Sequence, residues 1–216
     1  MAEGGRAVLA ASRALDRDGH NVVSALLAAS GPFYQWDHYP AGDVVDAATG
    51  AQYFYHAHPP DPGFPEHGHF HCFMRLAAAG AAAPALCHLV AISMDAAGEP
   101  MRLFTVNRWV TGESWLPAPR LAPLLARLAA RRERPGAPVD RWIAGMLGLF
   151  GPQIRVLQRR RDRRLADWRR RHPARDALED RALEVVSSLE VAVSAQIAAV
   201  GQALGRPGRQ PRLTGR

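Results

Sequence analysis

Histidine spacing carries the clearest chemistry in this chain of 216 residues. Five of the nine histidines lie within sixteen residues, as His56-Ala57-His58 and His67-Gly68-His69-Phe70-His71. Side chains two apart on a β-strand share a face, so each His-x-His array points to one side of its strand. An antiparallel pairing that sets His58 opposite His67 also sets His56 opposite His69. All five rings are then expected on one face of a sheet.

Such a histidine face predicts a divalent metal site, because cross-strand Cβ atoms lie about 4.5 to 5.5 Å apart and imidazole nitrogen binds zinc at about 2.1 Å. Three histidine ligands would leave coordination positions open, as in catalytic sites. Imidazole and carboxylate donors without a thiolate pair leave Zn, Fe(II), Mn, Ni and Cu open as the ion. Glu66 is a candidate general acid or base, and Asp61 is a further carboxylate. The predicted ligands are His56, His58, His67, His69 and His71.

Two alternatives to a metal site stay open. The histidines could line a wet sheet face without any ion, or one of them could act as a nucleophile. His67 to Phe73 resembles the motif of histidine-triad nucleotide hydrolases, and this resemblance implies His69 as the residue that attacks phosphorus. The match covers seven residues and departs from the family at Pro65-Glu66 and at Gly68. Either His-x-His pair also resembles the first half of a cupin metal motif, whose second half the sequence lacks.

A longer resemblance covers most of residues 35 to 200. It rests on four segments: Glu66-His67-Gly68-His69-Phe70-His71, His88 to Asp95, Asn107 to Glu113, and Leu178 to Glu184. By these segments the chain resembles a family of uncharacterised bacterial proteins of similar length, a domain of unknown function. The resemblance implies membership of that family and brings no activity, cofactor or catalytic residue with it.

Arginine supplies the candidate substrate-binding residues near the histidines. Arg102 and Arg108 fall on one face of a predicted strand, and Arg75 ends another. A guanidinium group binds a carboxylate or phosphate of a small-molecule substrate through two parallel hydrogen bonds. The alternative is that these arginines pair with the acidic side chains of the same half of the chain.

Charge is distributed unevenly along the sequence. Residues 1–115 carry a formal charge of −5 and residues 116–216 carry +12, and all 27 basic residues are arginine. Nine arginines lie in residues 155–171, on a predicted helix. This pattern predicts either a face paired by acids within the chain or a non-catalytic binding surface for nucleic acid or an acidic protein partner.

The sequence patterns of the helices and strands that would position these residues predict an α+β fold. Its antiparallel sheet is expected to have about four strands. Two N-terminal helices are expected at 5–15 and 21–29, with Asn21 as an N-cap. Residues 34–46 are expected to be irregular, and apolar spacing after residue 116 predicts helices that end in a C-terminal helical hairpin. Short turns between strands favour antiparallel neighbours. The predicted strands are 51–58, 67–76, 87–95 and 101–110.

The change of pattern near Pro117 predicts two parts and a tail. Residues 1–116 form the α/β part with the histidine-rich sheet, 117–204 a helical part packed on it, and 205–216 a disordered tail. The sequence lacks an apolar run of about 18 residues and a secretory signal pattern, which predicts a cytoplasmic protein without a membrane span. Cys72 and Cys87 are expected in the core. The leading hypothesis is a metal-dependent hydrolase or oxygenase that acts on a small molecule.

Overall fold

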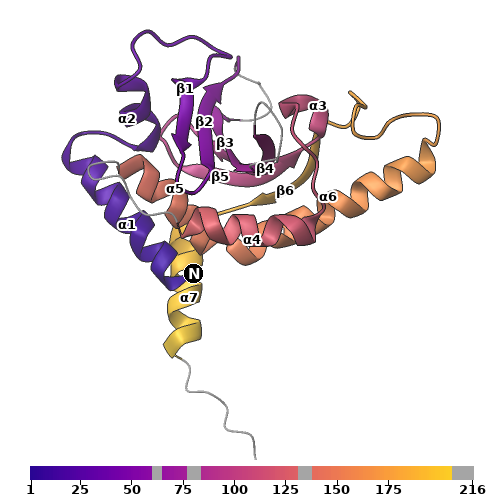
Figure 1. The fold of residues 1–216 in the computed structure, drawn as a ribbon. Helices are drawn as coiled ribbons and strands as arrows, with labels where there is room; N and C mark the ends of the chain where they lie inside the picture. The colour runs from indigo at the N-terminus through magenta and orange to yellow at the C-terminus, as the bar shows by residue number, and fades with distance from the viewer. Residues whose placement is uncertain (60–64, 77–83, 131–137, 206–216) are drawn as a thin grey trace, which may run out of the picture.

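A six-stranded antiparallel sheet organises the chain. The computed structural model describes residues 1–59, 65–76, 84–130 and 138–205 (Figure 1). The strands lie in the sheet in the order of the sequence, so the sheet is a meander. They are β1 (Tyr39–Asp46), β2 (Ala51–Ala57), β3 (Gly68–Leu76), β4 (Ala85–Met94), β5 (Pro100–Val106) and β6 (Val185–Glu190).

The longer helices gather on one face of this sheet, and the main hydrophobic core lies between the two layers (Figure 1). Tyr53 and Phe70 show the packing: Tyr53 Oη donates to Asp140 Oδ1 at 2.6 Å, and the Phe70 ring lies 6.0 Å from that of Trp142. The core combines residues from both sides of position 116. In the described ranges the helices are α1 (Ala2–Arg17), α2 (Val22–Ala28), α3 (Arg108–Thr111), α4 (Ala118–Ala129), α5 (Pro138–Leu149), α6 (Gly151–Arg171) and α7 (Val193–Gly205).

The opposite face of the sheet carries the histidines. Strands β2 and β3 pair antiparallel, with His56 opposite His69 and Phe54 opposite His71. Because side chains alternate along a strand, these four point away from the core, while Tyr53 and its neighbours point into it. The pairing predicted between the two His-x-His strands is therefore confirmed.

The α+β class and the antiparallel sheet are also confirmed, but the sheet has six strands rather than about four. The four predicted strands correspond to β2, β3, β4 and β5. Strand β1 occupies the segment that was expected to be irregular. Gly42 and Asp43 there have φ angles of 80° and 60°, and the register shifts between Tyr39 and Val44. This bulge interrupts the alternation of side chains by which a strand is recognised.

The predicted C-terminal helical hairpin is wrong. Helix α6 ends before Pro173 as expected, but turns and strand β6 follow it, and only α7 is helical beyond that point. Asp176 and Asp180 accept hydrogen bonds from the backbone N–H groups of Leu178 and Ala182, at 2.9 and 3.0 Å. Aspartate side chains that bind backbone two residues on stabilise turns in place of helix. The chain then adds β6 to the edge of the sheet beside β5.

The N-terminal helices agree with expectation, since the Asn21 side chain accepts from the backbone N–H groups of Val23 and Ser24 at 2.9 and 2.8 Å. Apart from Gly205, which ends α7, the predicted tail 205–216 lies outside the described residues, as does Asp61. In the described part of the chain, no helix combines the length and apolarity needed to cross a membrane.

Helices α1 and α5 cross at glycines, which gives a test of the packing. A Cβ atom on Gly145 would lie 2.9 Å from the backbone nitrogen of Val8 and 3.0 Å from the carbonyl oxygen of Gly4. No described atom would lie within 4 Å of a Cβ on Gly201 in α7. Gly145→Ala is therefore expected to destabilise the fold by about 1–3 kcal/mol, whereas Gly201→Ala is expected to stabilise it by up to about 1 kcal/mol. Urea unfolding measures both, and a stabilised Gly145→Ala would contradict the crossing.

Candidate metal centre

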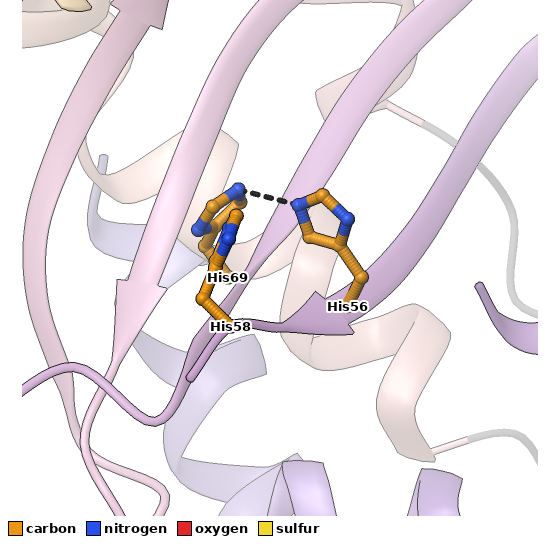
Figure 2. Close-up of side chains that lie close together, drawn as sticks. All are labelled: His56, His58 and His69. Carbon is orange, nitrogen blue, oxygen red and sulfur yellow. Dashed lines mark hydrogen bonds between the residues drawn. The ribbon is translucent and has the colours of Figure 1, made fainter. Parts of the chain in front are cut away.

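Three imidazoles converge where the β2–β3 hairpin faces away from the core. One ring nitrogen from each of His56, His58 and His69 lies within 4.8 Å of the others (Figure 2). The Nε2 atoms of His56 and His69 are 2.8 Å apart. Two nitrogens bound at about 2.1 Å to one tetrahedral ion lie about 3.4 Å apart, so a small adjustment of the rings would admit such an ion.

Glu66 orients the central ring of this set. Its Oε1 lies 2.5 Å from His69 Nδ1, and since a carboxylate can only accept, Nδ1 carries the hydrogen. In the neutral ring this leaves a lone pair on Nε2, the nitrogen that faces His56. Glu66 Oε2 accepts from Ser93 Oγ at 2.5 Å and from Arg102 Nη2 at 3.2 Å. A carboxylate that holds a histidine in one tautomer in this way is a common outer contact of metal sites.

A second pair of histidines continues from His69 into the interior. His71 Nε2 lies 3.0 Å from His69 Nε2, and His71 Nδ1 lies 3.0 Å from His88 Nε2. A bulge at Cys72/Phe73 sets His88 opposite Phe73 and brings its ring to this face. His71 and His88 are each 1% exposed. The structure thus places His71 as a buried neighbour of the three converging rings.

Burial favours the uncharged form of the imidazoles of His56, His58 and His71. Desolvation, followed by the charge of His69, lowers the pKa of His56 to about 3. The same causes lower the pKa of His58 and hold that of His71 well below its usual range. Burial alone would raise the pKa of Glu66, but its hydrogen bond with His69, then the contacts with Ser93 and Arg102, lower it. Neutral imidazoles beside an ionised carboxylate are the protonation states that a metal site requires.

His67 does not share the arrangement expected for all five rings. It precedes β3, and its Nδ1 lies 2.6 Å from the hydroxyl of Tyr55, a core residue. A Cβ atom on Gly68 would lie 2.6 Å from that hydroxyl and 2.4 Å from the carbonyl oxygen of His56. Glycine at this position therefore lets Tyr55 reach His67. Within the described residues, the converging set of nitrogens does not include His67.

The three candidate substrate-binding arginines separate in the structure. Arg102 reaches the centre through Glu66. Arg75 donates to Gln52 Oε1 at 3.0 Å, near the far end of β3. Arg108 does not share a strand face with Arg102, because it begins helix α3, where it contacts Glu179 and Asp176 at 2.7 and 3.4 Å. Of the three, Arg102 alone contacts a residue of the candidate centre by these bonds.

The family comparison covers nearly all of this architecture. The family described as Domain of unknown function (DUF6969) matches residues 2–191. The chain belongs to the DUF6969 family. No curated protein and no solved structure matches it. The DUF6969 match contains the whole histidine face and stops before α7. Its meander also differs from the two-sheet jelly roll of cupins, so the cupin resemblance stays local to one His-x-His pair.

Sequence reasoning on this DUF6969 chain missed several contacts of the centre. Ser93 and His88 lie on β4, and a bulge between Cys72 and Phe73 of β3 shifts the register at His88. Trp36 lies in the segment expected to be irregular, and its ring centroid is 4.4 Å from that of His58. The three aromatic residues among positions 33–36 were the available signal for this last contact. Cys72 and Cys87 are buried and unpaired with each other, as predicted.

Proposed function

We propose that this protein is a metal-dependent enzyme that acts on a small molecule. The observation that carries the proposal is the convergence of His56, His58 and His69, with Glu66 orienting His69. His56 and His58 are only partly buried, so the centre is partly accessible from the face of the sheet opposite the main core. A divalent ion held there would polarise a substrate oxygen or activate water or dioxygen.

The contacts of Glu66 define its part in this proposal. Both of its carboxylate oxygens are occupied, one by His69 and the other by Ser93 and Arg102. We therefore assign Glu66 as a positioning residue for His69, in place of a free acid or base. His71 is the candidate for a further ligand, because its tautomer with the proton on Nδ1 would present a lone pair on Nε2, the nitrogen that faces His69. His67 stays a predicted ligand without support from its contacts.

Elemental analysis tests the proposal. Protein purified without a His tag is expected to contain close to one equivalent of a transition metal, before or after reconstitution with Zn, Fe(II), Mn, Ni or Cu. The His56→Ala/His69→Ala variant is expected to contain none and to keep the fold by circular dichroism. Zinc would favour hydrolysis, and iron, manganese or copper would favour redox chemistry.

Failure of wild-type protein to bind any of these ions would exclude the metal enzyme. The histidine-triad alternative, with His69 as nucleophile, would then be tested by hydrolysis of nucleotides in the presence of a chelator. Phosphate release that survives the chelator and disappears in His69→Ala would establish it.

A second candidate function rests on helix α6. Its arginine face is its set of exposed arginines, Arg155, Arg159, Arg160, Arg163, Arg164, Arg169, Arg170 and Arg171. Three acids of the segment after α6 pair with arginines outside this face, since Asp176 and Glu179 contact Arg108 and Asp180 contacts Arg175. An ion pair on the face itself joins Arg170 to Asp167 at 2.5 Å.

The arginine face borders a groove that fits a phosphate backbone. The groove has a volume of about 440 Å³ and is lined by Arg160, Arg163, Arg164, Asp167, Val186, Ser187 and Ser188. Apolar residues of α6 such as Ile154 and Leu157 are buried, so the face lacks the apolar centre of a protein interface and the apolar side chains that enter a membrane. These features favour nucleic acid over the acidic protein partner.

Salt dependence tests this second candidate. Binding of a fluorescent DNA duplex is measured by anisotropy across a salt series. Arg160→Gln/Arg163→Gln/Arg164→Gln is expected to reduce the slope of log K against log salt by about 3, since each phosphate contact contributes about 0.9. The matched control removes the same charge from α1, at the exposed Arg6, Arg13 and Arg17. Equal losses in both variants, or tighter binding to polyglutamate or anionic vesicles, would reject nucleic acid as the partner.

A further inference from the structure

An exposed aromatic rim borders the candidate metal centre. We define the aromatic rim as Phe33, Tyr34 and Trp36, whose exposed fractions are 41%, 62% and 60%. The other large exposed apolar side chains of the described residues are Met1 at the start of the chain, Leu9 in α1 and Leu204 in α7. Grouped exposed apolar side chains beside polar groups mark binding sites more often than isolated ones do.

The rim contacts the histidines directly. The Trp36 ring stands at 88° to the His58 ring, with centroids 4.4 Å apart. Phe33 stacks on His67 at 5.8 Å and 22°. A molecule that reached the open side of His58 would therefore meet the indole of Trp36.

The backbone at Trp36 supports a functional role. Its φ angle is 73°, in the left-handed region that large side chains avoid. Its backbone N–H donates to the carbonyl oxygen of Ala57 at 2.9 Å, which ties the strained residue to the end of β2. Glycine or asparagine would adopt this conformation at lower cost. Strained residues persist mainly at functional sites, and here the strain presents an exposed indole beside the centre.

Aromatic rings also line the centre on its buried sides. The Phe104 ring lies 5.0 Å from that of His69, and the Phe54 ring lies 5.6 Å from that of His56. Phe104 and Phe54 are 2% and 7% exposed, so they form a floor, whereas Trp36 forms an accessible wall. The Arg102 guanidinium lies 4.7 Å from the centroid of Phe104 and adds positive charge to the same region.

We infer that the centre takes a planar aromatic compound that carries an oxygen donor, with the oxygen directed at the ion held by His56, His58 and His69 and the ring against Trp36. This inference rests on the proposed metal centre. An indole wall favours flat rings through stacking and apolar contact, and a divalent ion beside Arg102 favours an anionic oxygen.

A pair of metal-binding probes with one head group tests the ring preference. Benzohydroxamate and acetohydroxamate offer the same two oxygen donors and differ in the phenyl ring. On zinc-loaded protein, titration calorimetry is expected to give benzohydroxamate roughly tenfold higher affinity. Equal affinities for the two probes on protein that contains zinc would overturn the inference without contradicting the proposed metal centre. Absence of zinc would instead reject the proposed function.

Trp36→Gly is the decisive variant, because glycine accepts the positive φ and the fold is not at risk. It is expected to keep its zinc, to unfold at the same or higher urea concentration, and to bind both probes equally. Trp36→Phe is expected to keep part of the preference for benzohydroxamate. Leu9→Ala, which changes a distant exposed residue, is expected to keep all of that preference. A preference that survives Trp36→Gly, loss of zinc in that variant, or zinc-loaded protein that binds neither probe would each overturn the inference.

Discussion

His69→Ala is expected to lower the affinity for zinc by roughly a hundredfold or more. His69 is the central ring, with Nε2 2.8 Å from His56 and 3.0 Å from His71 and with Nδ1 on Glu66. Glu66→Gln retains the shape but removes the negative charge that orients His69. A loss of about 10–100-fold is expected from this change, as for other outer contacts of metal ligands.

Competition against a chromogenic chelator measures these affinities. His67→Ala is the matched control from the same motif, because its ring bonds Tyr55 instead of joining the converging set. It is expected to change zinc affinity by less than about twofold, even though it removes an imidazole from the chain. Similar losses in His67→Ala and His69→Ala would show that the assignment of ligands is wrong.

Metal-free protein is expected to lose stability steeply below pH 6.5. Burial lowers the pKa of His88 to about 3, helped by Arg161 and His69, and the pKa values of His56 and His71 are lowered as well. Between the ordinary histidine pKa near 6.5 and the folded values, the unfolded chain binds a proton at each position and the folded chain does not. Each such histidine therefore lowers the free energy of unfolding by about 1.4 kcal/mol for every pH unit of acidification. The three together lower it by about 4 kcal/mol per pH unit.

Urea unfolding at pH 7, 6 and 5 checks this slope. His88→Leu removes one of the three groups and is expected to make the dependence shallower by about 1.4 kcal/mol per pH unit. This comparison uses the slope, which is independent of any loss of packing that the substitution causes. A free energy of unfolding that stayed flat from pH 7 to 5 would contradict the burial of these neutral rings.

The pairing of the two histidine strands was predictable because it depends on local patterns. Alternation along residues 51–57 and 68–76, with a proline-rich turn between them, sets both the strands and their register. The candidate ligands His56 and His69 could be placed opposite one another on that basis. The departure of His67 was not predictable, because it depends on Tyr55 passing over the bare backbone of Gly68.

Features that depend on irregular backbone or on distant contacts could not be predicted from the sequence. Strand β1 contains residues with positive φ, which strand patterns do not indicate. His88 reaches the cluster because of a bulge in the pairing of β3 with β4, and no residue type near His88 indicates that bulge. Strand β6 was mistaken for helix because its apolar spacing also fits a helical stripe, and contacts with β5 decide the outcome. The partners of the arginines likewise depend on tertiary packing, as Arg108 shows by binding acids about seventy residues away.

The candidate ligands all belong to one hairpin, and this has a consequence for folding. His56 and His69 are separated by 13 positions, and His58 lies between them. An ion bound there closes a short loop, whose closure entropy is small compared with that of a long-range cross-link. Because the segment is short, an unfolded chain would also bring these side chains together, so an ion would bind the unfolded state as well. Such binding would reduce the effect of the ion on equilibrium stability. Metal is therefore expected to speed the pairing of β2 with β3 more than it raises the melting temperature.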